Sequence, residues 1–203
     1  MKQFTFDDVE EVAEILAGGG LVAFPTETVY GIGCRFDRKE SFDRLVKVKR
    51  RPADKPFTMM LGEVAKIGEY AYVTPKQQKL IEKFMPGEVT FIFKRKDTVP
   101  DFAALNGPTI GIRIPAHPGL LKLLRTVDIP LLVPSANRSG EKPCSSAEEV
   151  NRVFGDELDG VIAAPTGDAI PSTVVLLTGA DPVVLRAGKV TREEIEKVWK
   201  EAR

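Results

Sequence analysis

The 203-residue sequence has one histidine and two cysteines, and it lacks the common phosphate-binding and nucleophile motifs. Zinc sites need three or four ligands, so His117, Cys34 and Cys144, which lie far apart in the chain, do not predict a metal site. The G-x-x-x-x-G-K-[ST] loop, the G-x-G-x-x-G fingerprint and the G-x-S-x-G elbow are missing. A Ser-His-Asp triad built on His117 is disfavoured, because His117-Pro118 is typical of a helix entry. We therefore expect chemistry that depends on cations, hydroxyls and the backbone.

Net charge and long apolar runs are also absent. Lysine plus arginine and aspartate plus glutamate number 29 each, so no overall field favours nucleic acid or an anionic membrane. The apolar runs have the length of strands, too short for a membrane span, and the N-terminus lacks the pattern of a secretion signal. Cysteines without paired spacing are typical of a reducing compartment. The sequence therefore predicts a cytoplasmic protein that does not associate with membranes.

A chain of this length with 43% hydrophobic and 29% charged residues is typical of one folded domain, which we expect to span residues 1–203. Apolar residues alternate between helical and strand spacing. The pattern predicts strands over 21–24, 57–61, 88–93, 109–114, 131–133, 160–163, 173–177 and 183–185, and helices near 9–16, 42–51, 62–70, 75–84, 120–124, from 146 onward and over 191–199. The rhythm, with many strands in the middle of the chain, predicts an α/β protein whose sheet is mixed and carries packed helices.

The segment Pro-Thr-Glu-Thr-Val-Tyr-Gly over residues 25–31 follows a buried strand and places hydroxyls, a carboxylate and a phenol where a loop should open. Ligand sites in α/β proteins tend to lie beyond the carboxyl ends of strands. The alternative is an ordinary turn in which threonine and glutamate bond to the local backbone. The local sequence does not decide between them.

Residues 47–55 contain five cations in nine positions: Lys47, Lys49, Arg50, Arg51 and Lys55. Cations in the last turn of a helix interact favourably with its dipole, so an exposed helix end is one interpretation. The cluster is denser than capping requires. If the cations meet a polyphosphate, each pair of unit charges at about 4 Å interacts by roughly 4 kcal/mol at an effective dielectric near 20.

Two further segments place polar residues beside apolar strands. Pro134–Gly140 puts Ser135 and Asn137 at i and i+2, where they point to the same side of an extended chain. A simple strand-to-loop turn is the alternative, since serine, asparagine and glycine favour turns. Arg113 stands within an apolar strand and needs an anionic partner, either a ligand or an internal carboxylate. Ser172 and Arg186 repeat the pattern of a polar residue at a strand end.

In combination, these segments resemble the YrdC-like family of threonylcarbamoyl-AMP synthases. Lys49-Arg50-Arg51 matches the family's K-x-R, Ser135-Ala136-Asn137 matches its S-x-N, and residues 25–31 stand at the expected place before them. The resemblance covers 18–188 and is to the short, single-domain form, because the chain ends at Arg203. It implies a twisted mixed sheet around a deep concave cavity, a fold shared with dihydroxybutanone-phosphate synthase (RibB).

The resemblance implies a nucleotidyltransferase that makes threonylcarbamoyl-AMP and pyrophosphate from L-threonine, bicarbonate or CO2, and ATP, with Mg²⁺ held through the ATP phosphates rather than by protein ligands. The product would supply the threonylcarbamoyl group for adenosine next to the anticodon of certain tRNAs. A separate tRNA threonylcarbamoyl transferase complex would perform that second step. A carbamate is already an oxyanion, so it can attack the α-phosphorus without a catalytic base.

The resemblance also implies roles for particular residues. Catalysis would depend on Lys49, Arg51, Ser135 and Asn137. ATP would be bound by these four residues together with Thr109 and Arg186. Threonine would be bound by Thr26, Tyr30, Arg113 and Ser172, with Arg113 as the partner of its carboxylate or carbamate.

Two other functions are compatible with parts of the sequence. An RNA-binding module could use residues 47–55 on an RNA backbone, and weak RNA binding could accompany the enzyme activity. Zero net charge and the lack of an aromatic-interleaved RNA motif argue against RNA binding as the sole function. A relative that has kept the cavity and lost or changed the chemistry is the second alternative. The presence of Lys49, Arg51, Ser135 and Asn137 argues against it.

Overall fold

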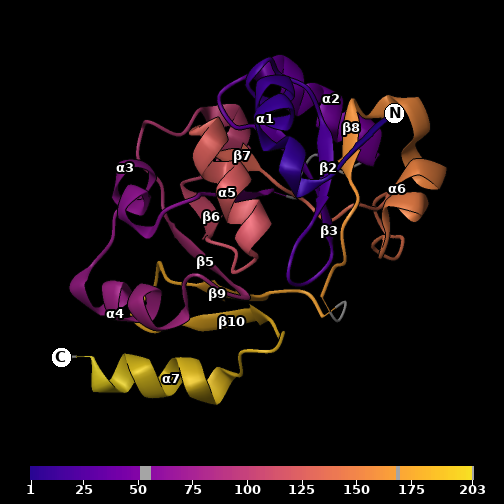
Figure 1. Cartoon of the computed structure of the whole chain (residues 1–203). Helices are drawn as coiled ribbons and strands as arrows, with labels where there is room; N and C mark the ends of the chain where they lie inside the picture. Colours follow the sequence, from indigo (N-terminus) through magenta and orange to yellow (C-terminus); the bar gives the residue numbers. More distant parts are fainter. Residues whose placement is uncertain (51–55, 168–169, 203) are drawn as a thin grey trace.

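The computed structural model describes residues 1–50, 56–167 and 170–202, and its centre is one sheet of ten strands (Figure 1). The strands are β1 (Lys2–Phe4), β2 (Val22–Pro25), β3 (Tyr30–Arg35), β4 (Thr58–Met60), β5 (Val89–Lys94), β6 (Thr109–Arg113), β7 (Leu131–Leu132), β8 (Gly160–Ile162), β9 (Thr173–Leu176) and β10 (Val183–Arg186). The α-helices are α1 (Val9–Ala17), α2 (Lys39–Lys49), α3 (Ile67–Tyr70), α4 (Pro75–Phe84), α5 (Pro118–Val127), α6 (Ala147–Phe154) and α7 (Arg192–Glu201). No helix in the described ranges has the length and apolar character that a membrane crossing requires.

The strand order in the sheet is β1-β8-β2-β3-β7-β4-β6-β5-β9-β10. Strands pair in parallel in β1–β8, β2–β8, β4–β6 and β5–β9. They pair in antiparallel fashion in β2–β3, β3–β7, β4–β7, β5–β6 and β9–β10. The predicted mixed sheet of an α/β protein is therefore confirmed.

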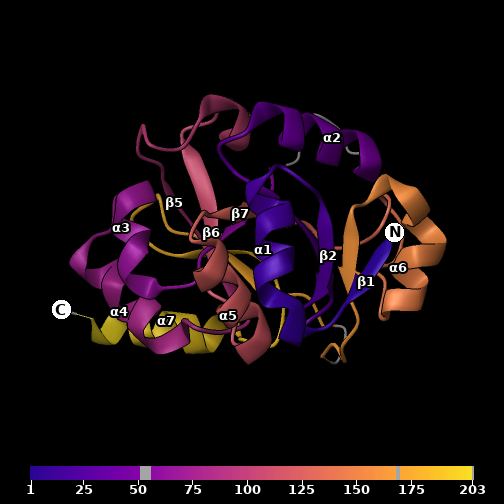
Figure 2. The same ribbon diagram turned by 45° about the horizontal axis from the view of Figure 1, so that its top comes forward.

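Helices pack on both faces of the sheet, because successive strand residues point to opposite sides. Met59 and Met60 belong to two different apolar clusters, and so do Leu132 and Leu131. On one face α1 and α5 lie side by side (Figure 2) and bury Val12, Leu16, Leu120 and Leu123. On the other face the larger cluster joins α2, α4, α6 and α7 to the sheet through Leu45, Leu80, Val150 and Ile195. Each such side chain contributes about 1.5–3 kcal/mol by leaving water.

The α1–α5 layer leaves part of its face of the sheet uncovered. Its cluster includes residues of β2, β4, β7 and β8, such as Val22, Phe24, Met60 and Leu131, whereas the described residues of β5, β6 and β9 make no contribution to it. On this second group of strands the same face carries polar and small side chains that line a cavity. The cavity therefore lies beside the α1–α5 layer, over the middle of the sheet.

Most of the predicted elements are present with ends shifted by one to three residues, and α4 matches the predicted 75–84. Two strands were missed, β1 and β3. The predicted helix over 62–70 is a short 3₁₀ turn followed by the four-residue α3. The helix expected from 146 onward is α6, where Ser146 Oγ accepts from Glu149 N and the Glu149 carboxylate accepts from Ser145 N.

The end of α2 also differs from the prediction. This helix was expected near 42–51, but it stops at Lys49 because Arg50 adopts a left-handed conformation with φ of 48°. Residues 51–55 lie outside the described part of the chain.

His117 forms the N-cap of α5, as the sequence predicts. Its Nδ1 accepts a hydrogen bond from Leu120 N at 3.2 Å, and its ring packs against Phe6 with centroids 4.9 Å apart. Burial lowers the pKa of His117 below its ordinary value of 6.5, although the nearby Glu27 carboxylate opposes that shift. A lowered pKa means that the unfolded chain binds the proton more readily, so this capping bond stabilises the fold above about pH 6.5 and weakens as the pH falls through the folded pKa.

We expect His117→Asn to keep the cap through its amide oxygen and to remove the titration, whereas His117→Ala removes the cap and costs about 1 kcal/mol of unfolding free energy at pH 7.5. Urea unfolding at about pH 7.5 and 5.5 would measure both effects. Wild type should lose more stability between these two pH values than His117→Asn. Equal losses in the two proteins would contradict the assignment.

Candidate functional site

The open part of the sheet forms the floor of a cavity of about 460 Å³. Every second residue of three adjacent strands lines it, namely Thr58 and Met60 of β4, Thr109, Gly111 and Arg113 of β6, and Thr90 and Ile92 of β5. The residues between them, such as Ile112 and Phe91, point into the core on the other side. The volume lies within the range typical of small-ligand sites.

The absence of a side chain at Gly111 determines the depth of the cavity at its floor. Gly111 is the central residue of β6, and a Cβ atom placed on it would lie 3.3 Å from Thr90 Cγ2 and 3.7 Å from Ile92 Cγ1. The strand pairs on both sides, with β4 and β5, so the floor is fixed in position.

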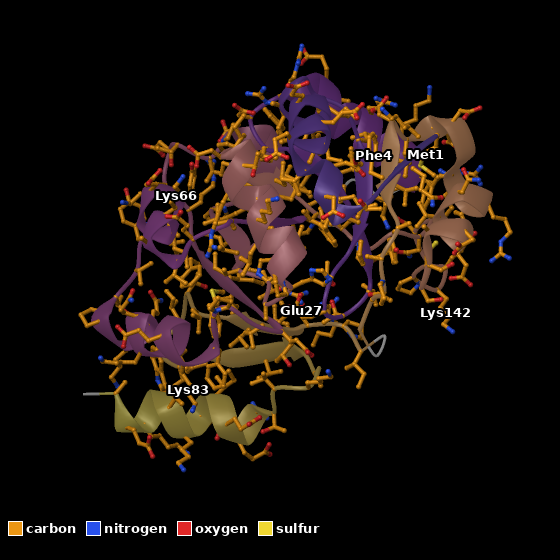
Figure 3. The ribbon with its side chains drawn as sticks, in the orientation of Figure 1. Met1, Phe4, Glu27, Lys66, Lys83 and Lys142 are labelled. Carbon is orange, nitrogen blue, oxygen red and sulfur yellow. The ribbon has the colours of Figure 1, made fainter. Side chains whose placement is uncertain are left out.

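The β2–β3 loop forms one wall of the cavity, and Glu27 lies at its tip (Figure 3). Thr26 Oγ1 accepts hydrogen bonds from Thr28 N at 3.0 Å and Val29 N at 3.1 Å, which folds the loop into a tight turn. Thr26 and Thr28 also line the cavity. The two interpretations of residues 25–31 are therefore compatible, because the threonines shape the turn and border the cavity together.

Arg113 is buried at the end of β6 and borders the cavity. Its Nε donates to Gly87 O and its Nη1 to Thr28 Oγ1, both at 3.2 Å. Its Nη2 lies 2.8 Å from Glu27 Oε1. The internal ion pair proposed as one explanation of Arg113 is thus present, and the same guanidinium adjoins the space where a ligand would bind.

A second arginine lies near the first. Arg186 Nε and Nη2 donate to Ser172 O at 3.1 and 2.9 Å, and Nη2 also donates to Ser172 Oγ at 3.1 Å. Ser172 Oγ lies 3.0 Å from Thr90 Oγ1. Partial burial, and then the positive charge of Arg113, lower the pKa of Arg186. Two guanidiniums near enough to repel each other at one cavity favour the binding of an anion between them.

Ser135 and Asn137 follow β7, and Ser135 pairs with Gly31 near the start of β3. Ser135 Oγ donates to Asn137 Oδ1 at 2.6 Å, so the two side chains face the same way, and both line the cavity. Asn137 Nδ2 donates to Arg138 O and Glu141 O, both at 2.8 Å. The asparagine therefore closes a turn of its own, and the orientation of its amide is fixed by the backbone.

Lys49 differs from its prediction. It was expected on an exposed helix end, but its side chain is only 1% exposed. Its position four residues after Leu45 places it on the buried face of α2. Lys49 Nζ donates to Ser135 O and Asn137 O at 2.5 Å and to Asn137 Oδ1 at 3.0 Å. The lysine of the K-x-R motif and the S-x-N motif, both expected to bind ATP, are therefore in direct contact with each other.

Two predicted residues need separate mention. Arg51 lies outside the described residues. Tyr30 borders the cavity, but its ring belongs to the larger core cluster. Its hydroxyl donates to Ala164 O at 2.7 Å and accepts from Ala164 N at 3.3 Å, and burial raises its pKa. This bonding connects β3 to the segment after β8.

The structure brings the other predicted residues to this one cavity: Thr26, Thr109, Arg113, Ser135, Asn137, Ser172 and Arg186. The sequence analysis missed Thr28, Thr90 and Glu141, which also line it. Thr90 had a usable signal, since it is the polar member of the apolar run Val89–Phe93. Glu141 had none, because an acidic residue in a polar loop is typical of any surface.

A family model matches residues 14–188. It is the Sua5/YciO/YrdC family, described as "Telomere recombination". The match covers most of the chain, so the chain belongs to this family, and the resemblance inferred from the motifs is confirmed.

Proteins named threonylcarbamoyl-AMP synthase are among its relatives. The one from Pyrococcus abyssi (strain GE5 / Orsay) is 36% identical over 193 residues, which cover 94% of this chain and 57% of that protein. The one from Bacillus subtilis (strain 168) is 33% identical over 193 residues, covering 94% and 56%. The chain therefore spans little more than half the length of these curated relatives.

A solved structure shares the fold. The crystal structure of P. abyssi Sua5 complexed with L-threonine superposes with a TM-score of 0.93 at 32% identity, and the match covers 100% of this chain and 61% of that one. The predicted YrdC-like α/β fold is thus confirmed over the chain.

We expect Lys49→Met to destabilise the protein by about 3 kcal/mol, because it leaves buried carbonyl oxygens of the Ser135–Asn137 turn without their donor. Lys47→Met, on the exposed face of the same helix, is the matched control and should change stability by less than about 0.5 kcal/mol. Chemical denaturation would measure both. Equal stability of the two variants would show that Lys49 does not support the turn.

Proposed function

We propose that this chain is a threonylcarbamoyl-AMP synthase that joins L-threonine, bicarbonate or CO2, and ATP to form threonylcarbamoyl-AMP and pyrophosphate. The observation that carries the proposal is the cavity that Arg113 and Arg186 line together with Ser135 and Asn137. Its cations suit carboxylate and phosphate groups, and its hydroxyls suit an amino acid and a nucleotide. The names of the relatives support the same activity.

In this proposal threonine occupies the end of the cavity near Arg113. The Arg113 guanidinium pairs with its carboxylate or carbamate, and Thr26, Tyr30 and Ser172 border the amino acid. Support comes from the cavity, which all four residues line. Because the Tyr30 hydroxyl is bonded to Ala164 O, Tyr30 would contact threonine through its other atoms.

ATP occupies the remaining space, with Thr109, Ser135 and Asn137 around it. Arg186 contacts it from the border with the amino-acid end, where its guanidinium bonds to Ser172. Arg51 would contribute a cation to the triphosphate. Lys49 would act through the turn that it holds, because its ammonium is bonded to Ser135 O and Asn137 O.

The chemistry needs positioning more than acid or base catalysis. A carbamate oxygen attacks the α-phosphorus, the bond between that phosphorus and the bridging oxygen breaks, and pyrophosphate leaves with the electron pair. The cavity supplies cations for the charge on the leaving group. No residue of the described lining needs to take a proton in this step, because the attacking oxygen is already anionic.

Mg²⁺ fits this cavity as an ion that arrives with ATP. Proteins usually bind it through one or two carboxylates plus substrate phosphates. Glu141 is the carboxylate among the described lining residues, and the described residues contain no cluster of three or more acidic, histidine or cysteine side chains. When bound to the phosphates, Mg²⁺ neutralises charge that develops on pyrophosphate.

We also propose that the product passes to a separate tRNA threonylcarbamoyl transferase complex, and that this occurs in the cytoplasm. The proposed product is a mixed anhydride, which reacts readily with nucleophiles and must be transferred soon after release. Because the product is chemically unstable, we expect the transferase complex to receive it soon after its release.

We expect the purified protein, mixed with ATP, Mg²⁺, bicarbonate and L-threonine, to form threonylcarbamoyl-AMP and pyrophosphate, detected by mass spectrometry. Serine and glycine in place of threonine are the controls for specificity, and omission of bicarbonate should abolish the product. Absence of the adenylate, together with salt-sensitive RNA binding, would favour the RNA-binding alternative instead.

We expect Arg113→Ala to raise the KM for threonine by about tenfold or more, which corresponds to about 1.4 kcal/mol, because a charged partner of the carboxylate is lost. The KM for ATP should change by less than about threefold. Steady-state kinetics with each substrate varied in turn would separate the effects. An unchanged threonine dependence would overturn the role of Arg113.

A further inference from the structure

Glu27 has no role in the proposed function, although it is largely buried beside Arg113. Its side chain is 15% exposed and that of Arg113 is 5% exposed, so their ion pair is largely shielded from water. Glu27 Oε1 accepts a hydrogen bond from Ala116 N at 2.9 Å and lies 2.8 Å from Arg113 Nη2. Its other oxygen, Oε2, is buried and has no hydrogen-bond partner within the described residues.

The three groups that hold the Arg113 guanidinium differ in charge. Gly87 O and Thr28 Oγ1 are neutral acceptors, whereas Glu27 carries a negative charge. Burying an unpaired guanidinium destabilises the folded protein. Glu27 offsets this cost because its charge pairs with that of Arg113. Hydrogen bonds to the two neutral acceptors hold Nε and Nη1, whereas Nη2 has no hydrogen-bond partner within the described residues and is held by the charge of Glu27 alone.

The balance of charge at this end of the cavity also depends on Glu27. Arg113 and Arg186 are close enough for the charge of Arg113 to lower the pKa of Arg186. The bonds of Arg186 to Ser172 are to neutral oxygens. With Glu27 present, these three groups carry one net positive charge, and without it they would carry two.

We propose that Glu27 is a positioning residue that orients Arg113 toward the amino acid and limits the charge of this end of the cavity to that of a single carboxylate. It thereby favours the monoanionic threonine carboxylate over dianions such as phosphate groups, which two uncompensated guanidiniums would attract. This proposal rests on the proposed function, because it concerns the amino-acid end of the same cavity.

Glu27→Gln tests it. The amide oxygen can still accept from Ala116 N, but the negative charge beside Arg113 is gone. We expect the KM for threonine to rise about tenfold and the KM for ATP to change by less than about twofold. We also expect inorganic sulfate, used as a dianion probe, to become at least about tenfold stronger as a competitor of threonine.

Two further variants separate the effect of the Glu27 charge on Arg113 from a general loss of folding. Glu27→Asp keeps the charge with a shorter reach, so sulfate competition should stay within about twofold of wild type. Asp159→Asn is the matched control, because it weakens a partly exposed ion pair with Arg44 at the β8 end of the sheet. It should leave both KM values and sulfate competition unchanged. Thermal melting of each variant reports its folding.

A double variant tests whether Glu27 acts through Arg113. In the Arg113→Ala background, Glu27→Gln should cause no further rise in the KM for threonine. A further tenfold rise would overturn the positioning role. Wild-type protein that forms the adenylate, combined with unchanged threonine KM and sulfate competition in Glu27→Gln, would overturn this inference and leave the proposed function standing. Wild-type protein that forms no adenylate and binds no threonine would overturn both.

Discussion

The arrangement of this cavity depends on one buried ammonium group. Lys49 Nζ is bonded to the carbonyl oxygens of Ser135 and Asn137, which come from a segment 86 and 88 residues later in the chain. These bonds join the end of α2 to the turn after β7, and Ser139 N also donates to Lys49 O at 2.8 Å. A charged donor in a shielded place interacts more strongly with its acceptors than a surface lysine would. The turn that carries Ser135 and Asn137, both of which line the cavity, is therefore fixed to the end of α2.

A second constraint comes from the cations. Positive charge is needed in a cavity that receives anions, yet buried positive charge destabilises the empty protein. The structure meets both requirements with partners of different strength: a carboxylate for Arg113 and neutral oxygens for Arg186. Arg186, which has only neutral partners among these bonds, is therefore the cation whose charge is less compensated in the empty site.

Much of the fold was predictable, and the exceptions have physical causes. Helix α4 starts at a Thr74 cap with proline at the next position and ends just before Pro86-Gly87, so its bounds match the prediction. Strand β3 was missed because Tyr30–Arg35 contains two glycines, which are uncommon in strands but fit beneath Phe24 and Val133 here. The candidate residues could be chosen from polar types at strand ends. The bonding of the buried Lys49 could not, because its acceptors lie in a turn 86 and 88 residues later in the chain.

The floor of the cavity carries a consequence for substrate range. At Gly111 the sheet contributes only backbone, between two strands that hold it rigidly on either side. Replacing its hydrogen by a methyl group would push against Thr90 at 3.3 Å and raise the bottom of the site by about one carbon atom's thickness. The absence of a side chain at Gly111 thus sets the depth available to a ligand. A larger residue at this strand position would reduce that depth without changing the charged groups above it.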